Sequence, residues 1–431
     1  MYLLYNILLY LVALPLLPFH LLRMLFRGKT RRGVRERFGF YTEGRFSALQ
    51  GRKILWIHAV SVGETRAAVP LVKALKKRFP EYALVMSNMT ETGRAVAEGI
   101  KEIDHRIYFP YDFPWVMERV FRRLAPDLAV IVETEIWPNF MRSASRRGVP
   151  VILVNGRISD RSFPRYRRLR FCVEPVIRQF ALMCMQSDLD AERIVAMGAP
   201  TERVKVTHNL KFDMQAGGLS RVEPGEIRRK FRLPDGCRIW VAASTHAGEE
   251  EQVLETYRRL LLDGVELLLV LVPRHPDRCR AVGELLVSRN LSFVRRSQIE
   301  KETADLPSGT VLLVDSIGEV LEFYTVADLV FVGGSLVPVG GHNVLEASLL
   351  GKPVLFGPHM HNFKEISRLL IEARGGVSVG CIDELYQTAA GLLAEPELGR
   401  AMGAGGYALL EENRGATEHT VKAIEGMLEN R

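Results

Sequence analysis

The alternation of short apolar runs with segments of helical periodicity is the feature that most constrains the fold of this sequence. Lys53–His58 and Tyr82–Ser87 have the pattern of buried strands, and a helix is predicted from Glu64 to Lys77 between them. The alternation continues through the strands predicted at Leu128–Val132 and Val149–Val154. Strands that alternate with helices form a parallel sheet with helices on both faces. We therefore predict an α/β fold.

A second series of the same kind begins at Arg238–Ala243, after a polar linker at Met214–Gly225. It continues through the strands predicted at Glu266–Val272, Val311–Val314 and Leu329–Val332. A chain of 431 residues is long enough for two or three domains. We predict two doubly wound halves of similar size with a cleft between them.

The N-terminus is a separate apolar segment. Met1–Leu22 contains no Asp, Glu, Lys or Arg and has about the length needed to cross the apolar core of a bilayer. A basic block follows it, with Arg23, Arg27, Lys29, Arg31, Arg32, Arg35 and Arg37. Basic residues beside an apolar segment mark its cytoplasmic side and attract anionic lipid headgroups. We expect a membrane anchor that either spans the bilayer or lies in its interface; a buried first helix with a basic linker is the alternative.

A glycine-rich stretch, Phe331–Glu365, follows the last of these strands. Its glycines, Gly333, Gly334, Gly340 and Gly341, precede a helix expected from Asn343 to Leu350. In α/β proteins, a strand that leads through glycines into a helix brings backbone N–H groups to a phosphate. Two ordinary turns beside a core helix are the alternative. A nucleotide site is favoured by the many polar side chains of the stretch: His342, Asn343, Glu346, His359, His361, Asn362, Lys364 and Glu365.

Acidic residues follow two strands of the first half. Glu64 lies at the turn after Lys53–His58, and Glu133 and Glu135 follow Leu128–Val132. Because the carboxyl ends of parallel strands share one edge, we expect these carboxylates to share a site. The alternatives are an acid favoured by the helix dipole at Glu64 and an exposed loop carboxylate at Glu133.

Other patterns argue against several classes of function. The five cysteines share no metal-type spacing and are expected to be reduced core residues. Asp188 and Asp190 are interpreted as helix-capping residues rather than metal ligands. No Walker A motif and no convincing G-x-G-x-x-G is present, which disfavours a kinase or a dinucleotide oxidoreductase. The net charge is +8, and beyond Arg37 we expect it to be spread thinly, so no nucleic-acid binding is predicted.

A series of motifs covers nearly the whole chain. They are ERFGFY (Glu36–Tyr41), HAVSVGET (His58–Thr65), ETEIWPN (Glu133–Asn139), NLKFD (Asn209–Asp213), STHAGEE (Ser244–Glu250), VPRHP (Val272–Pro276), SIGE (Ser316–Glu319) and FVGGSLVPVGGHNVLEA (Phe331–Ala347). In this order they resemble the Kdo transferase family. Its members transfer 3-deoxy-D-manno-oct-2-ulosonic acid (Kdo) from CMP-Kdo to the lipid A precursor.

The resemblance implies the GT-B architecture, in which two Rossmann-like domains face a cleft. It also implies an inverting glycosyltransferase with no cofactor and no metal, at the cytoplasmic side of the inner membrane. Glu64 matches the general base of the family, and Glu133 and Lys211 match residues that support the transition state. The matching CMP contacts are Pro273, Arg274, Ile317, Gly318, Glu319, Asn343, Val344, Leu345 and Glu346.

The expected divisions follow from the patterns and the resemblance. They are a membrane anchor (1–22), a basic juxtamembrane segment (23–45), an N-terminal acceptor-binding domain (46–213), a C-terminal CMP-Kdo-binding domain (226–405) and a C-terminal helix (406–431) with the option of packing back on the N-terminal domain. The implied partners are CMP-Kdo, the lipid A precursor and anionic lipids of the inner membrane. The alternatives are a GT-B transferase that uses a UDP-sugar or ADP-sugar on a membrane lipid, and a membrane-tethered nucleotide-binding scaffold.

Overall fold

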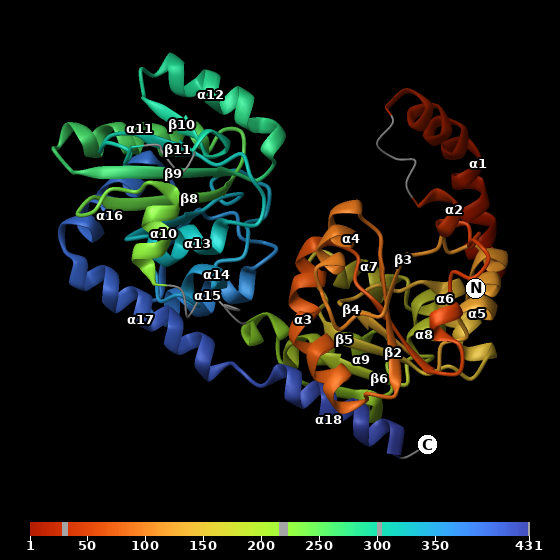
Figure 1. Ribbon diagram of the computed structural model, residues 1–431. Coiled ribbons are helices and arrows are strands. Elements are labelled where there is room, and N and C mark those ends of the chain that lie inside the picture. Colours follow the sequence, from red (N-terminus) through yellow and green to blue (C-terminus); the bar gives the residue numbers. More distant parts are fainter. Residues whose placement is uncertain (28–32, 215–222, 300–303, 430–431) are drawn as a thin grey trace. The chain divides into compact units, whose positions relative to one another are not determined.

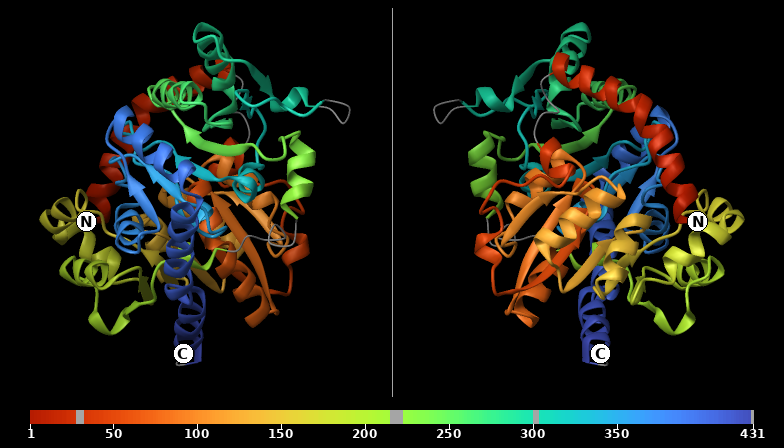
Figure 2. Two further views of the ribbon diagram at one scale, coloured as in Figure 1. Left: turned by 90° about the vertical axis from the view of Figure 1, so that its left-hand side faces the viewer. Right: turned by 90° about the vertical axis from the view of Figure 1, so that its right-hand side faces the viewer.

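The computed structural model describes residues 1–27, 33–214, 223–299 and 304–429, with the backbone alone for 17–27. The chain divides into two compact units, here called unit 1 (Met1–Asp213 with Arg414–Arg431) and unit 2 (Met214–Asn413). Each unit is built on a seven-stranded sheet with helices on both faces (Figures 1 and 2). Neighbouring strands are parallel throughout both sheets. This confirms the predicted α/β fold with two doubly wound domains.

Unit 1 has the strand order β3-β2-β1-β4-β5-β6-β7. The strands are β1 (Lys53–His58), β2 (Tyr82–Asn88), β3 (His105–Tyr108), β4 (Leu128–Val132), β5 (Val151–Gly156), β6 (Leu182–Met185) and β7 (Val204–Val206). The helices are α1 (Tyr2–Arg27), α2 (Val34–Arg37), α3 (Val62–Arg78), α4 (Glu91–Glu98), α5 (Pro114–Leu124), α6 (Pro138–Arg146), α7 (Phe163–Arg168), α8 (Arg170–Ile177), α9 (Asp188–Ala196) and α18 (Ala416–Glu429), with short 3₁₀ turns at η1 (Ser47–Leu49), η2 (Thr201–Arg203) and η3 (Leu210–Asp213). The order reverses between β1 and β4, and α/β proteins bind ligands beside such a reversal.

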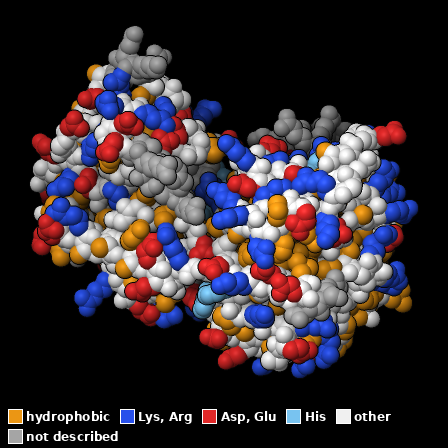
Figure 3. All heavy atoms as spheres, turned by 60° about the horizontal axis from the view of Figure 1, so that its bottom comes forward, with side chains coloured by type: hydrophobic (Ala, Val, Ile, Leu, Met, Phe, Trp, Pro, Cys, Tyr) orange, Lys and Arg blue, Asp and Glu red, His pale blue; other side chains and the backbone are white. Residues whose placement is uncertain are grey.

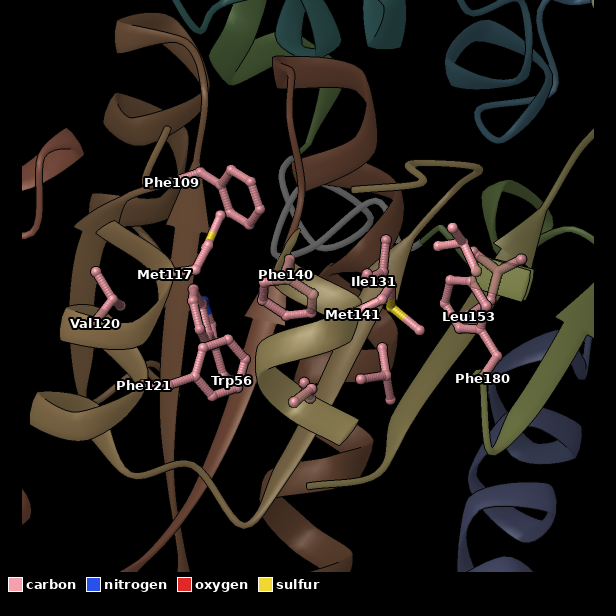
Figure 4. Packing of buried hydrophobic residues seen from close by; sticks show 14 of the residues in the cluster. Trp56, Phe109, Met117, Val120, Phe121, Ile131, Phe140, Met141, Leu153 and Phe180 are labelled. Atoms are coloured by element: carbon pink, nitrogen blue, oxygen red, sulfur yellow. The ribbon is translucent and has the colours of Figure 1, made fainter. Parts of the chain in front are cut away.

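The core of unit 1 follows from the alternation of side chains along the central strands. On one face of the sheet, the Trp56 ring packs against Phe121 of α5 and Phe140 of α6, with ring centroids 5.4 Å and 5.1 Å away (Figure 4). On the other face, Leu55 and Ile57 pack in a cluster with residues of α3, α4 and α18. Both faces of this sheet are therefore buried, which explains the continuous apolar strand patterns.

Unit 2 has the strand order β10-β11-β9-β8-β12-β13-β14, which reverses between β8 and β12. The strands are β8 (Arg238–Thr245), β9 (Leu267–Pro273), β10 (Phe293–Arg295), β11 (Val311–Leu313), β12 (Leu329–Val332), β13 (Val354–Phe356) and β14 (Gly376–Ser378). The helices are α10 (Pro224–Phe231), α11 (Glu250–Leu262), α12 (Cys279–Ser288), α13 (Val320–Val326), α14 (Leu345–Ser348), α15 (Lys364–Glu372), α16 (Ile382–Ala394) and α17 (Pro396–Glu412), with 3₁₀ turns at η5 (Pro276–Arg278) and η6 (Arg296–Gln298).

The C-terminal boundary differs from the expected one. Unit 2 runs to Asn413 rather than to 405, and the expected helix 406–431 is divided into the end of α17 and the whole of α18. The break lies at Gly415, whose φ is +109°, a conformation that favours glycine. The Gly415 N–H donates to Asp213 Oδ1 at 2.7 Å, so a carboxylate at the end of the first half fixes the start of α18.

Polar side chains of helix α1 form hydrogen bonds with the rest of unit 1. The Tyr5 hydroxyl donates to Asp112 Oδ2 at 2.9 Å, and the Asn139 amide donates to Asn6 Oδ1 at 2.7 Å. The opposite side of α1 exposes an apolar stripe of Leu3, Leu4, Ile7, Leu8, Leu11 and Val12. Among the helices of the described residues, none combines the length and the apolar character that crossing a membrane requires.

The basic block after α1 is described only in part. Lys29, Arg31 and Arg32, and the side chains of Arg23 and Arg27, lie outside the described residues. Arg37 donates to the Met89 carbonyl oxygen at 2.5 Å, and its guanidinium lies 4.6 Å from the centre of the Tyr108 ring. Arg37 is therefore engaged in the packing of unit 1.

The described surface carries mixed charges. Lys and Arg side chains are interspersed with Asp and Glu over both units on the face shown in Figure 3. Of the five cysteines, Cys184, Cys237 and Cys279 are buried, whereas Cys381 is exposed, so the expectation that all of them are core residues is wrong.

Candidate active site

Glu64 is held by the turn that joins β1 to α3. Its Oε2 atom accepts a hydrogen bond from the Val60 N–H at 2.6 Å, and its Oε1 atom accepts one from the Ser61 hydroxyl at 2.9 Å. Ser61 is also the N-cap of α3, because its oxygen accepts from the Glu64 N–H at 3.4 Å. This reciprocal arrangement resembles a capping box and fixes the carboxylate at the edge of the sheet.

The environment of Glu64 raises its pKa to about 7. Burial is the largest cause, because it disfavours the charged carboxylate, and the charges of Glu133 and Glu135 act in the same direction. The hydrogen bonds from Val60 and Ser61 oppose the shift without cancelling it. Burial and Glu133 also raise the pKa of Glu135. The three carboxylates therefore lie close together, as the adjacent strands β1 and β4 require.

Glu133 forms an ion pair with Lys211 from the end of the first half. Lys211 Nζ lies 3.3 Å from Glu133 Oε1, and the two side chains are 13% and 26% exposed. Glu133 has a φ of +59°, a conformation that is unfavourable for a residue with a side chain. Strain of this kind persists where the surrounding structure imposes it, and it is concentrated at functional sites.

A buried amide network positions Lys211. The Asn209 side chain donates to Gln186 Oε1 at 3.0 Å, and the Gln186 amide donates to the Asn155 carbonyl oxygen at 2.9 Å. Asn155 Oδ1 accepts from the Leu210 N–H at 2.9 Å, and Asn209 Oδ1 accepts from the Lys211 N–H at 3.0 Å. Asn155 and Gln186 were not identified from the sequence, because Asn155 lies on β5, Gln186 follows β6, and only the fold joins them to the NLKFD motif.

The expected CMP contacts lie in three loops of unit 2. Pro273 ends β9 and Arg274 follows it, Ile317–Glu319 lies between β11 and α13, and Asn343–Glu346 follows β12. Since these strands are parallel, the three loops lie at one edge of the sheet. The side chains of Val344 and Leu345 are fully buried, so only their backbone could touch a ligand.

Several of these side chains are already engaged within unit 2. Glu319 forms two hydrogen bonds with the Arg296 guanidinium, at 2.9 Å and 3.2 Å, and lies 3.6 Å from Lys230 Nζ. Asn343 Oδ1 accepts from the Leu345 N–H at 3.2 Å. In contrast to Glu319 and Asn343, Ile317 is 84% exposed.

A carboxylate from the loop after β8 binds part of the glycine-rich stretch. The fully buried carboxylate of Glu249 accepts four backbone N–H bonds, from His246 and Gly334 to Oε2 and from Ser335 and Leu336 to Oε1, at 2.7 to 2.9 Å. These N–H groups are used by a carboxylate of the protein itself. In this structure the N–H groups of Gly334, Ser335 and Leu336 are therefore not offered to a phosphate, whereas Glu249 does not bind those of the expected CMP contacts, Asn343–Glu346.

The glycines instead allow protein segments to approach one another. A Cβ atom on Gly333 would lie 2.6 Å from the Ser244 carbonyl oxygen, which is too close. The N–H groups of Gly340 and Gly341 both donate to the Gly334 carbonyl oxygen, at 3.1 Å and 2.7 Å. The helix expected at Asn343–Leu350 is only the four-residue α14, so a helix dipole is not available at this position.

Histidines surround the same edge of unit 2. His246 Nε2 and His342 Nε2 are 2.9 Å apart, and their rings are stacked. Burial, followed by the charge of Arg274, lowers the pKa of His342 to about 3. The His275 ring centre lies 6.2 Å from that of His246. His246 and His275 were not selected from the sequence, although both belong to recognised motifs.

The D-x-D pattern, Asp188–Asp190, lies at the N-terminus of α9. Ser187 is the N-cap of α9 and accepts from the Asp190 N–H at 3.2 Å, while Asp190 Oδ1 accepts from the Ile158 N–H at 2.7 Å. The pattern therefore lies at the cap of α9, but the capping side chain is that of Ser187 rather than that of Asp188 or Asp190. Within the described residues, no group of three or more His, Cys, Asp or Glu side chains is arranged to hold a metal ion.

Comparisons with known proteins show to which family this chain belongs. The model of the 3-deoxy-D-manno-octulosonic-acid transferase (kdotransferase) family matches residues 32–214. The chain is 36% identical to the 3-deoxy-D-manno-octulosonic acid transferase of Haemophilus influenzae over 93% of this chain and 92% of that relative. It belongs to the Kdo transferase family. The relative from Bordetella pertussis, with the same description, is 33% identical over 87% of each chain.

A solved structure of an epimerase has a similar fold. The UDP-GlcNAc 2-epimerase of Neisseria meningitidis, in a complex with UDP-GlcNAc, matches with a TM-score of 0.59 and 13% identity over 87% of this chain and all of that one. At this identity the likeness shows the fold alone, and it agrees with a GT-B type arrangement of two Rossmann-like domains.

Glu249→Gln is expected to lower the free energy of unfolding by about 2 to 3 kcal/mol, because the amide NH₂ would face backbone N–H donors. Urea unfolding measures this loss, and hydrogen exchange at Ser335 and Leu336 should become faster. Glu251→Gln is the control, since its carboxylate accepts a single bond, from the Gly248 N–H at 3.0 Å. Equal stability of the two variants would contradict the assignment of Glu249 as the anchor of this loop.

Proposed function

We propose that this protein transfers Kdo from CMP-Kdo to the lipid A precursor, a phosphorylated and acylated disaccharide, with inversion at the anomeric carbon. Family membership supports the reaction class, because the curated relatives are described as 3-deoxy-D-manno-octulosonic acid transferases. The observation that carries the assignment within the site is the Glu64 carboxylate, fixed by two hydrogen bonds beside Glu133 and Lys211.

Glu64 acts as the general base in the proposed reaction. Its carboxylate takes the proton of an acceptor hydroxyl while that oxygen forms a bond to the anomeric carbon of Kdo. The bond from that carbon to the phosphate oxygen breaks, and CMP leaves with the electron pair. A pKa of about 7 suits this role, because an appreciable fraction of Glu64 is ionised near neutral pH and the ionised form is still basic.

Lys211 and Glu133 support the transition state in this scheme. The Lys211 ammonium places a positive charge beside the Glu133 carboxylate, and this ion pair keeps the charge at the site. Glu133 has a second effect, because its charge raises the pKa of Glu64 and makes Glu64 a stronger base once it is ionised.

Unit 2 binds the donor in this proposal. Arg274 provides positive charge for the CMP phosphate, and His246, His275 and His342 provide ring N–H groups nearby. The backbone of Val344 and Leu345 contacts the nucleotide, since their side chains are buried. Positive charge and fixed donors stabilise a departing phosphate, so the scheme needs no metal ion.

We further propose that the protein acts at the cytoplasmic side of the inner membrane and attaches through α1. The outer side of α1 is a stripe of leucine, isoleucine and valine side chains, whereas its tyrosine hydroxyl and asparagine groups bind unit 1. A contiguous apolar surface on a helix of this kind is typical of membrane association. The acceptor is itself a membrane lipid, so attachment keeps the enzyme beside its substrate.

The reaction is tested with purified protein, CMP-Kdo and lipid A precursor, and with UDP-sugars and ADP-heptose in separate reactions. We expect a Kdo-containing product by mass spectrometry only with CMP-Kdo. Glu64→Gln should reduce transfer at least about 100-fold, because the base is removed, and should keep CMP affinity unchanged. Transfer from a UDP-sugar or ADP-sugar instead, or full activity of Glu64→Gln, would contradict the proposal.

The rate of transfer should rise with pH through about 7, because protonated Glu64 cannot accept a proton. Glu133→Gln removes a negative neighbour that disfavours ionised Glu64, so it should shift the acid limb of the kcat/KM profile to lower pH. Glu135→Gln is the matched control and should shift the limb less, since its charge is the weaker influence on Glu64. An acid limb that does not move in Glu133→Gln would exclude Glu64 as the titrating group.

Attachment through α1 is tested by replacing two exposed leucines, Leu4→Gln and Leu8→Gln, in one variant. Binding to vesicles of phosphatidylglycerol and phosphatidylethanolamine should weaken about 10-fold or more, because buried apolar area is lost. The control replaces Leu262 and Val287, which are 71% and 65% exposed in unit 2, by glutamine. Equal weakening in both variants would show that α1 is not the attachment surface.

A further inference from the structure

The segment Arg157–Arg178, which follows β5, is the most basic part of the described chain that the proposed function does not use. It contains seven arginines, one aspartate and one glutamate, which gives a net charge of +5 out of +8 for the whole protein. Its aromatic residues, Phe163, Tyr166 and Phe171, are interleaved with the arginines. The expectation that charge beyond Arg37 is spread thinly is therefore wrong.

Five of the seven arginines of this segment fall into two groups. Arg170 and Arg178 each lie 2.9 Å from a Glu174 carboxylate oxygen, so their charges are paired. Three exposed arginines on α7, namely Arg165, Arg167 and Arg168, form no ion pair with a carboxylate in the described part of the chain. These three residues are here called the α7 arginines. Unpaired cations that gather on one short helix favour an anionic ligand.

The backbone of the segment is firmly fixed. The Arg157 N–H donates to Thr134 Oγ1 at 2.9 Å, which ties the start of the segment to the loop after β4. The Ile158 carbonyl oxygen accepts from the Arg193 guanidinium at 2.6 Å. Phe163 of α7 packs against the core of unit 1. The α7 arginines therefore project from a held scaffold, which limits the entropy lost when they bind a ligand.

Helix α7 adjoins the candidate active site. Because β5 pairs with β4 in parallel, the segment after β5 leaves the sheet at the same edge as Glu133 (Figure 1). The charge of Glu135 contributes, after burial, to the raised pKa of the Tyr166 hydroxyl on α7. Glu135 in turn influences Glu64. A ligand held by the α7 arginines would therefore lie beside the proposed base.

The same surface exposes two large apolar side chains. Leu169 and Phe171, between α7 and the first turn of α8, are 48% and 70% exposed. A surface that combines unpaired arginines with exposed apolar groups suits a ligand with both phosphates and acyl chains. It suits nucleic acid less, because leucine offers no stacking face and the adjoining carboxylates repel a continuous phosphate backbone.

We infer that the α7 arginines bind a phosphate group of the acceptor lipid and that Leu169 and Phe171 contact its acyl chains. This inference rests on the proposed function and adds the residues that select the acceptor. Arginine suits the role, because its guanidinium can donate two parallel hydrogen bonds to one phosphate. The surface orients the disaccharide so that one hydroxyl reaches Glu64.

The test compares Arg167→Gln/Arg168→Gln with a control pair, Arg122→Gln/Arg123→Gln on α5. The control arginines are also exposed, lie in unit 1 and form no ion pair with a carboxylate in the described residues. In the α7 variant, KM for the acceptor should rise about 10-fold to 100-fold, with kcat and CMP affinity close to wild type. The control should change KM less than about threefold, through general charge alone.

Binding is measured separately, with neutral phosphatidylcholine vesicles that contain either the phosphorylated acylated disaccharide or its dephosphorylated form. Wild-type protein should prefer the phosphorylated form, and the α7 variant should lose that preference. The inference is overturned if the α7 variant keeps the preference, if both pairs weaken binding equally, or if the variant loses affinity for single-stranded RNA instead. Because this readout needs no turnover, it remains decisive even if wild-type protein transfers no Kdo.

Discussion

Both sheets of this protein are parallel, and the position of every candidate residue depends on that constraint. Parallel strands place all of their carboxyl ends at one edge, so loops that are distant in sequence meet there. In unit 1 the loops after β1 and β4 bring Glu64 and Glu133 together beside the reversal of strand order. In unit 2 the loops after β8 and β12 bring Glu249 to the glycine-rich stretch in the same way.

Two carboxylates of the protein, Glu249 and Glu64, have different roles because their surroundings differ. Glu249 accepts four backbone N–H bonds and is enclosed, so its charge is compensated and serves to fix a loop. Glu64 accepts two hydrogen bonds and lies beside other acids, so its charge is under-compensated and its pKa rises to about 7. Partial burial and the charge of Glu133, which the two hydrogen bonds oppose without cancelling, therefore account for the raised pKa of Glu64.

Most of the strands and the edge that carries the site could be predicted from the sequence, but the short strands β10 and β14 and the helix α10 could not. Continuous apolar runs such as Leu128–Val132 identify strands that are buried on both faces, and acids directly after them identify the edge. The glycine-rich stretch shows the limit of this reasoning. Its pattern fits a phosphate loop, but Glu249, which lies far from it in sequence, occupies three of its N–H groups, those of Gly334, Ser335 and Leu336. Local patterns cannot reveal such a distant partner.

The sequence by itself determined the α/β class, the family and the identity of Glu64, Glu133 and Lys211 as candidates, because these follow from local periodicity and motif order. Only the tertiary structure decided the pKa of Glu64, the amide network behind Lys211 and which arginines of the segment 157–178 pair with a carboxylate. Burial and electrostatic interactions depend on distances between segments that are far apart along the chain. Those distances are set when the sheets assemble, and a linear pattern does not contain them.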